Sequence, residues 1–439
     1  MRQFRAAVRQ DERVNALIED LQWRGLIAQS TDIEALAEEL DKGPLTLYVG
    51  FDPTAPSLHL GNLLQIVTMR RFQAHGHLPL ALVGGATGLI GDPKMTGERT
   101  LNPAEVVEGW AARLRSELER FYDFDGPAAA RMVNNLDWTA AVDVIAFLRD
   151  IGKHFSVNRM LDREAVAARL AAEGISFTEF SYQLLQSFDY LELFRRYGCH
   201  LQTGGSDQWG NITAGVDLVR RVEGAHVHAL TTPLITKADG TKFGKTETGT
   251  VWLDPSMTSP YAFFQFWLNA DDRDVSTFLR FYSEKPHADI ESLERATVEA
   301  PQKREAQRAL ARELTTLVHG AAATEAVEAA AAALFGQGDL ASVDEVTLGA
   351  ALAEVPHCTV TSSDIVDGHL PDIVELLTRS GLAQSRGAAR RTVEEGGAYV
   401  NNERVTAEDH APAVEQLLAG RYLVLRRGRK TLAGVVVEG

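Results

Sequence analysis

LYVGFDPTAPSLHLGN, residues 47–62, predicts a buried strand, a tight loop and a helix in direct succession. Residues 45–49 are apolar enough for a buried strand, and Gly50 then lets the backbone turn. Residues 52–54 are typical of a turn, and Ser57 is well placed to cap the helix that follows. We expect the rest of the chain to be organised around this unit.

The start of that helix is a candidate phosphate site, because free backbone N–H groups at a helix N-terminus attract anions. Thr54, His59 and Asn62 add side-chain donors there. His59 and Asn62 lie three residues apart, so both can face one ligand. A capped helix with one ordinary polar histidine would explain the same residues, and the pattern alone leaves both interpretations open.

Length and composition limit the class of protein. A chain of 439 residues is long enough for two or three domains, and 45% hydrophobic with 24% charged residues is usual for a soluble protein. The net charge of −16 argues against binding nucleic acid by bulk electrostatics. Residues 371–439 nevertheless carry ten Lys or Arg against nine Asp or Glu, so this tail could still bind RNA.

The cysteines and the apolar runs exclude other classes. Cys199 and Cys358 are far apart, so we expect neither a disulfide framework nor a structural metal. No apolar run approaches the roughly 18 residues that span a membrane. The first residues lack the apolar core of a signal peptide, so a cytoplasmic protein is expected, with a mitochondrial transit peptide as the alternative.

Apolar strands followed by glycine loops predict an α/β body with a parallel sheet covered on both faces. Residues 80–83 form a second continuous apolar run, and the glycine-rich loop 84–93 follows it. Asp92 in this loop is either a turn residue or a partner for an ammonium group. Residues 234–236 are predicted as a further strand.

The segment 177–194 is predicted as a helix that carries polar residues on one face. Tyr182, Gln186 and Asp189 stand at i, i+4 and i+7, which places them on the same side. A solvated stripe on an amphipathic helix would give the same pattern, so the spacing does not by itself indicate a site.

Two later stretches also suggest nucleotide binding. In residues 204–209, Gly205 would allow close approach of a nucleotide and Asp207 could accept hydrogen bonds from ribose hydroxyls. Lys242 and Lys245 are cations three residues apart, suited to the charge of a departing pyrophosphate, although two lysines usually mark an ordinary surface loop. The stretch is not a P-loop, because Asp239 stands where the first glycine is required.

These motifs together resemble a known family. His59-Leu60-Gly61-Asn62 resembles the His-Ile-Gly-His signature of class I aminoacyl-tRNA synthetases, and the 242–246 stretch KFGKT resembles their Lys-Met-Ser-Lys-Ser loop. The stretches YVGFDPT at 48–54 and GGSDQWGN at 204–211 are similar to those of bacterial-type tyrosyl-tRNA synthetases, and the resemblance extends over nearly the whole chain.

The resemblance implies four parts. They are a Rossmann-like catalytic domain at 1–250 with a helical insertion at about 102–200 that forms a dimer interface, an all-helical domain at 251–335 that approaches the anticodon, a linker at 336–368, and a small α+β RNA-binding domain at 369–439. In the last part, Arg386, Arg390 and Arg391 lie on one side of a predicted helix. Three arginines on a helix could also be only solvating charge.

The resemblance further implies that tyrosine is activated by ATP and then transferred to its tRNA. Tyr48 and Asp189 would bind the phenolic hydroxyl, and Asp92, Tyr182 and Gln186 the ammonium, with Gln208 near the carboxylate. The nucleoside would contact Gly50, Asp52, Gly205 and Asp207. The phosphates would be handled by Thr54, His59, Asn62, Lys242, Lys245 and Thr246. Mg²⁺ would arrive with ATP, since no dedicated carboxylate cluster is evident.

Two departures from the family and two alternatives accompany this interpretation. Val49 replaces a cysteine that some members use to touch the ribose, and the loop 94–99 is a residue shorter than usual, which favours Arg99 over Lys94 as the pyrophosphate contact.

A synthetase for tryptophan shares the fold, but an indole would not need both Tyr48 and Asp189. An RNA-binding or splicing-assistance protein that has lost catalysis is the alternative of a different class.

Overall fold

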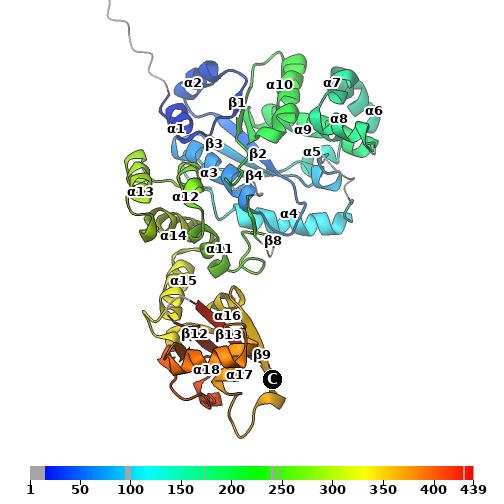
Figure 1. The fold of residues 1–439 in the computed structure, drawn as a ribbon. Coiled ribbons are helices and arrows are strands. Elements are labelled where there is room, and N and C mark those ends of the chain that lie inside the picture. Colours follow the sequence, from blue (N-terminus) through cyan, green and yellow to red (C-terminus); the bar gives the residue numbers. More distant parts are fainter. Residues whose placement is uncertain are drawn as a thin grey trace, which may run out of the picture. The chain divides into compact units, whose positions relative to one another are not determined.

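The computed structural model describes residues 15–93, 100–172, 174–238, 243–246, 249–428 and 431–438, with only the backbone described at 164, 165, 245 and 246 (Figure 1). The chain divides into two compact units. The first contains the residues up to Asp254 together with Asp271–Arg295, and the second contains Pro255–Ala270 together with Ala296 onward.

The first unit is built on a six-stranded sheet in the order β1–β6–β5–β2–β3–β4. All neighbouring strands are parallel except β1, which runs antiparallel to β6. The prediction of an α/β fold with a parallel sheet is therefore confirmed. The strands are β1 (Gln29–Ser30), β2 (Thr46–Phe51), β3 (Leu78–Val83), β4 (Arg131–Asn134), β5 (Cys199–Gly205) and β6 (His228–Thr232).

Strand β2 is the centre of this sheet, since it pairs with β3 on one side and β5 on the other. Its residues Leu47, Tyr48 and Val49 are all buried, as the continuous apolar run predicts for a strand covered on both faces. The helices that pack on the sheet strands are α3 (Leu60–Ala74), α4 (Ala104–Leu118), α9 (Phe177–Tyr197) and α10 (Trp209–Glu223). The chain order changes direction between β2 and β5, so this is the switch point where ligands bind in open α/β sheets.

Shorter elements complete the first unit. They are α1 (Ala16–Arg24), α2 (Ile33–Asp41), η1 (Thr87–Leu89), α5 (Leu136–Thr139), α6 (Val144–Ala146), η2 (Phe147–Ile151), η3 (Gly152–His154), α7 (Val157–Leu161), α8 (Glu164–Ala171), η4 (Ser206–Gln208), β7 (Lys245–Thr246), β8 (Gly249–Thr250), α12 (Asp272–Tyr282) and most of α13 (His287–Glu299), whose residues from Ala296 belong to the second unit. The strand predicted at 234–236 is wrong, because β6 ends at Thr232 and Pro233, which has no N–H donor, follows directly.

The second unit combines a helical part with a small sheet. Helices α11 (Pro260–Leu268), α14 (Glu305–His319), α15 (Ala321–Leu334) and α16 (Glu345–Ala353) pack on one another, with η5 (Pro301–Lys303) and η6 (Leu340–Ser342) between them in the chain. The sheet has the order β11–β10–β12–β13–β9. Its members are β9 (His357–Thr361), β10 (Ala398–Val400), β11 (Glu403–Arg404), β12 (Tyr422–Arg427) and β13 (Thr431–Glu438), accompanied by η7 (Ser362–Asp364), α17 (Ile373–Arg379), α18 (Arg386–Glu394) and η8 (Val414–Gln416).

The predicted small α+β fold at the C-terminal end is present in this second unit, with a core of aliphatic side chains from α17, α18 and the sheet. The range 336–368, predicted as a linker, holds α16 and β9, and β9 pairs in parallel with β13. In the part of the chain that the structure describes, no helix combines the length and hydropathy needed to span a bilayer.

Within the first unit, Arg24 ties α1 to the end of α12. Its guanidinium is 3% exposed, forms an ion pair with Asp20 at 2.7 Å, and donates to the carbonyl oxygens of Arg280, Ser283 and Lys285. Those carbonyls lie in the last turn of α12 or directly after it, where a helix leaves acceptors without intrahelical donors. One buried cation therefore holds an N-terminal helix to a segment more than 250 residues away.

Replacing Arg24 by Met is expected to lower the free energy of unfolding by about 3 kcal/mol, because the Asp20 carboxylate and three carbonyls lose a buried cationic donor. Urea denaturation of wild type and variant measures the change. Arg312→Met is the control, since Arg312 pairs with Glu328 on the surface at 3.5 Å and its loss should leave the unfolding curve in place. Equal curves for all three proteins would contradict the structural role of Arg24.

Candidate active site

The predicted site residues lie at the carboxyl ends of the central strands of the first unit. Tyr48 and Gly50 are on β2, Asp92 follows the loop after β3, and Gly205 ends β5. Helix α9 contributes Tyr182, Gln186 and Asp189. Parallel strands bring their carboxyl ends to one edge of a sheet, so residues from distant parts of the chain meet there.

Tyr48 and Asp189 form the buried end of the site. Tyr48 is 1% exposed, and its hydroxyl has no hydrogen-bond partner among the described residues. Burial, and then the nearby Asp189 carboxylate, raises the pKa of Tyr48 well above its ordinary value. The pair thus presents a donor and an acceptor in an apolar surrounding, a combination suited to a ligand hydroxyl.

Asp189 is held by two donors that the sequence analysis did not identify. Asn135 Nδ2 donates to Asp189 Oδ2 at 2.9 Å, and Trp138 Nε1 donates to Oδ1 at 2.8 Å. Burial raises the pKa of Asp189 to about 7, and these two hydrogen bonds oppose the rise. The carboxyl therefore titrates near neutral pH although both its oxygens accept hydrogen bonds.

Asn135 also joins Asp189 to the glycine loop. It accepts from the Ala86 backbone N–H at 2.7 Å and donates to the Thr87 hydroxyl at 2.9 Å. Asn135 comes directly after β4. A polar side chain at the carboxyl end of a parallel strand often belongs to a ligand site, and this is the signal that could have revealed Asn135.

A second polar group lies around Asp52 and Tyr182. Tyr182 donates from its hydroxyl to Asp52 Oδ2 at 2.6 Å, and Thr87 donates to Asp52 Oδ1 at 2.6 Å. Burial and the carboxylates of Asp52 and Asp92 raise the pKa of Tyr182 well above its ordinary value. Gln186, one turn further along α9, has a buried side-chain oxygen without a hydrogen-bond partner in the described residues.

A third group joins the loop after β3 to α10. Asp92 accepts from Gln208 Nε2 at 2.9 Å and from Asn211 Nδ2 at 3.2 Å. Asp92 and Gln208, predicted from distant stretches, are therefore in direct contact. Asn211, which was not predicted, completes the contact by also donating to Gln208 Oε1 at 3.1 Å.

His59 and Asn62 shape the start of α3. His59 is the N-cap: its Nδ1 accepts from the Gly61 N–H at 3.1 Å, and the Asn62 side chain accepts from the His59 N–H at 3.1 Å. With Nδ1 accepting, the ring proton is on Nε2, and partial desolvation lowers the pKa of His59 so that the neutral form is favoured. Thr54, six residues before the first residue of α3, is exposed.

The prediction that Ser57 caps α3 is wrong. The helix begins at Leu60 with His59 as its cap, and the Ser57 hydroxyl instead donates to the Leu58 carbonyl at 2.9 Å and accepts from the Asp254 N–H at 3.1 Å. The reason is that the segment after β8 pairs with residues 58–60, which keeps Leu58 extended and starts the helix two residues later.

Glycines make room at the edge of the sheet. A Cβ on Gly84 would lie 2.0 Å from Asp52 Oδ1, and one on Gly205 would lie 2.5 Å from Asp207 Oδ1. Gly50 is exposed at the end of β2, so its backbone is open to a ligand. Any side chain at Gly84 would displace the carboxylate that holds Tyr182.

Several predicted residues are described only in part. Lys242 and the loop with Lys94 and Arg99 lie outside the described residues. Lys245 and Thr246 are described by their backbone, which forms β7 and pairs with β8. In the described residues, no three His, Cys, Asp or Glu side chains come together as metal ligands.

The three predicted RNA-binding arginines lie on α18 in the second unit. Arg386 pairs with Glu375 and Asp372, and Arg390 pairs with Glu408 at 3.4 Å. Arg391 is exposed.

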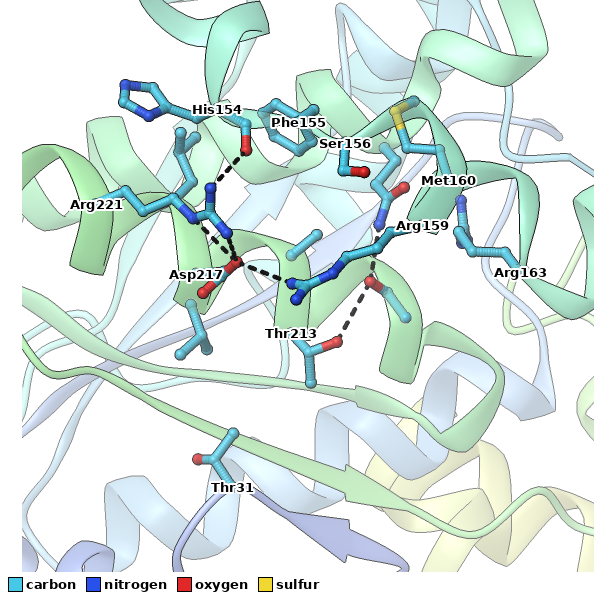
Figure 2. Close-up of a pocket in the computed structure, with 15 residues that line it drawn as sticks. Thr31, His154, Phe155, Ser156, Arg159, Met160, Arg163, Thr213, Asp217 and Arg221 are labelled. Carbon is cyan, nitrogen blue, oxygen red and sulfur yellow. Dashed lines mark hydrogen bonds and ion pairs between the residues drawn. The ribbon is translucent and has the colours of Figure 1, made fainter.

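A separate pocket of about 430 Å³ lies in the first unit and contains none of the predicted site residues (Figure 2). Figure 2 shows Asp217 of α10 between Arg159, at 3.7 Å, and Arg221, at 2.9 Å. Arg221 also donates to the carbonyl of His154 at 3.3 Å. The pocket is thus lined by an ion-pair network rather than by the acceptors and donors of the site at the sheet edge.

Comparison with known proteins decides the family. Residues 40–336 match the family model described as class I tRNA synthetases (W and Y), and residues 348–434 match the tyrosine–tRNA ligase SYY-like C-terminal domain. The chain belongs to the tyrosine–tRNA ligase family. It is 63% identical over 425 residues to the tyrosine–tRNA ligase of Streptomyces coelicolor, which covers 96% of this chain and 99% of that relative.

Other relatives give the same family. The tyrosine–tRNA ligase of Mycobacterium leprae is 57% identical over 426 residues, covering 96% of this chain and 99% of the relative. Among solved structures, a C-terminally truncated mitochondrial tyrosyl-tRNA synthetase of Coccidioides posadasii is 31% identical with a TM-score of 0.64, covering 71% of this chain and 90% of that one. The resemblance noted in the sequence is therefore confirmed.

The raised pKa of Asp189 predicts a pH-dependent stability. Between its ordinary value of 3.8 and about 7, the folded protein keeps a proton on Asp189 that the unfolded chain has lost. The free energy of unfolding should therefore fall by about 4 kcal/mol, relative to Asp189→Asn, as pH rises through this window, and the difference should level off at higher pH. Urea denaturation of both proteins at a series of pH values measures this, and a constant difference would contradict it.

Proposed function

We propose that this ligase activates L-tyrosine at the sheet-edge site. The tyrosine carboxylate attacks the α-phosphorus of ATP, the bond to pyrophosphate breaks, and tyrosyl-adenylate and pyrophosphate form. The tyrosyl group then passes to the 3′-terminal ribose of tRNA(Tyr), and AMP leaves. The observation that carries this proposal is the buried Tyr48 hydroxyl without a partner beside an Asp189 carboxyl fixed by Asn135 and Trp138.

In this proposal the amino acid lies with its phenol between Tyr48 and Asp189. Asp92, Tyr182 and Gln186 hold the ammonium group, and Gln208 lies near the carboxylate. The hydrogen bond that Gln208 donates to Asp92 and the buried side-chain oxygen of Gln186, which has no partner in the described residues, support these roles. A tryptophan substrate is disfavoured because an indole has no hydroxyl and would leave the buried Tyr48 hydroxyl without a partner.

The nucleotide lies along the carboxyl ends of β2 and β5 in the same proposal. Gly50, Asp52, Gly205 and Asp207 contact the nucleoside, while Thr54, His59, Asn62 and the lysine loop with Lys242, Lys245 and Thr246 meet the phosphates. The carboxylate nucleophile needs no general base, so catalysis depends on positioning and on stabilising the charge that builds on pyrophosphate. Mg²⁺ enters bound to ATP as part of that substrate.

Tyrosine-dependent exchange of labelled pyrophosphate into ATP tests the amino-acid site. Tyr48→Phe should lower kcat/KM for tyrosine by about 10-fold to 100-fold, because the substrate hydroxyl loses a buried partner. Lys245→Ala should lower kcat by about 100-fold through lost charge stabilisation. Tyr122→Phe is the matched control, since Tyr122 is also a buried tyrosine without a hydroxyl partner in the described residues, but lies outside the site.

The same assay separates the alternatives. Exchange supported by tyrosine, and far less by phenylalanine, is the expected result; rejection by about 10⁵ is known for this enzyme family. Exchange with tryptophan instead would overturn the substrate and keep the fold. No exchange with any amino acid would favour an RNA-binding or splicing-assistance protein without catalysis.

We also propose that the chain is a homodimer through its helical insertion at about 102–200. Of the sixteen large apolar side chains that are exposed in the described residues, nine fall in this segment. They are Val106, Leu136, Val144, Ile145, Leu148, Val157, Leu161, Leu170 and Phe177. So many exposed apolar residues in one segment are typical of an interface.

Phe177→Glu is expected to raise the dimer dissociation constant at least about 30-fold, because Phe177 is the most exposed of these nine residues at 74% and a charge there would be buried on association. Sedimentation velocity over a range of concentrations measures the change. Val298→Glu, 83% exposed in the second unit, is the control and should leave the association unchanged. A monomeric wild type would refute the proposal.

The C-terminal residues 369–439 are proposed to bind tRNA(Tyr), with the all-helical part at 251–335 approaching the anticodon and the whole enzyme acting in the cytoplasm. Arg391 is the arginine of α18 best placed for a phosphate, since Arg386 and Arg390 already have acidic partners. Those two would have to exchange carboxylates for phosphates on binding, which costs part of the affinity gained.

A further inference from the structure

Glu117, on α4, is a buried carboxyl that the site described above does not use. It is 6% exposed, and its Oε2 accepts from the Leu58 backbone N–H at 2.8 Å. Its Oε1 has no hydrogen-bond partner in the part of the chain that the structure describes. Burial raises the pKa of Glu117, an effect that the Leu58 N–H and the Ser57 hydroxyl oppose and the Asp254 carboxylate increases.

Leu58 stands directly before His59, the N-cap of α3. Leu58 is 2% exposed, so no water can replace a lost partner of its N–H without a change in packing. Its carbonyl accepts from the Leu253 N–H at 2.8 Å and from the Ser57 hydroxyl at 2.9 Å. Both backbone groups of Leu58 are therefore engaged, and Glu117 is the side chain that holds one of them.

The partner on the other side of Leu58 is the segment that leaves the lysine loop. Leu60 N–H donates to the Val251 carbonyl at 3.3 Å, Asp254 N–H donates to the Ser57 hydroxyl at 3.1 Å, and His59 forms an isolated bridge with Trp252. Val251 N–H in turn donates to the Gly244 carbonyl at 2.9 Å, inside that loop. Residues 57–60 thus lie between α4 and residues 251–254.

We propose that Glu117 is a positioning residue for adenylate formation. By fixing Leu58 against α4, it sets the start of α3, where His59 meets the phosphates, and it also sets the register of residues 251–254, which leave the lysine loop. The inference rests on the proposed function for the role of His59. Glu117 touches no substrate; it acts through the backbone of Leu58, and the amino-acid end of the site, around Tyr48 and Asp189, does not depend on it.

This division predicts which kinetic constant moves. Glu117→Ala should lower kcat of tyrosine-dependent pyrophosphate exchange by about 10-fold to 100-fold, the usual effect of a displacement near 1 Å at a reacting group. The dissociation constant for tyrosine should stay within about twofold, because the phenol site is held by α9 and β4. Glu117→Gln keeps a carbonyl acceptor for the Leu58 N–H and should retain kcat within about threefold. Glu119→Ala, exposed next to the end of the same helix, is the matched control and should behave as wild type.

A double variant distinguishes positioning from a general loss of structure. If Glu117 acts through His59, Glu117→Ala should cost less than about threefold in a His59→Ala background, because the group it positions is already gone. A full additional loss in that background, or a parallel loss of tyrosine affinity, would overturn the inference. Should Glu117→Ala unfold at the assay temperature, Glu117→Asp, which withdraws the carboxylate by one methylene, carries the same comparison.

The outcomes also separate this inference from the function on which it rests. Wild type without tyrosine-dependent exchange would refute the proposed function and remove the basis for this role of Glu117. Active wild type with a Glu117→Ala variant of equal kcat would refute only the role of Glu117. A low kcat for Glu117→Ala that Glu117→Gln restores, with unchanged tyrosine binding, is the result that supports it.

Discussion

The position of β2 between β3 and β5 is the constraint on which the site depends. All three strands are parallel, so their carboxyl ends lie at the same edge of the sheet. From β2 the strand order continues to β3 and β4 on one side, and β5 and β6 lie on the other. Backbone pairing with both β3 and β5 fixes Tyr48, and pairing with β3 fixes Gly50. Every other site residue is placed relative to them, by α9 packing over the strands or by loops that start where a strand ends.

Burial then determines the chemistry of the groups that this arrangement brings together. Asp52, Asp92 and Asp189 come from three different stretches, and an acidic cluster of this kind would be unstable without donors. The structure supplies them: hydroxyls for Asp52, amides for Asp92, and an amide with an indole N–H for Asp189.

Much of the fold could be predicted from the sequence, because the strand at 45–49, the glycine loops and the helical spacing of 177–194 are local signals. The contact between Asp92 and Gln208 was implied only by the family. Trp138 and Glu117 could not be predicted, since each is an ordinary residue locally and acts through a partner more than 50 residues away. Asn135 could be recognised only once the strand directly before it, β4, was identified. Ser57 failed as a helix cap for the same reason: pairing with residues 251–254 overrides a correct local preference.

The donors to Asp189 have a consequence for how this pocket could change during evolution or design. Asn135 and Trp138 each use one oxygen of the same carboxyl, and Asn135 is shared with the loop at Ala86 and Thr87. An apolar residue at position 189 would leave the donors of Asn135 and Trp138 without their shared acceptor, whereas changing either donor first would leave the buried carboxyl with an uncompensated burial cost. The effects of substitutions at positions 135, 138 and 189 are therefore epistatic. A change of substrate preference that replaces them one at a time passes through less stable intermediates, whereas replacing all three together avoids these.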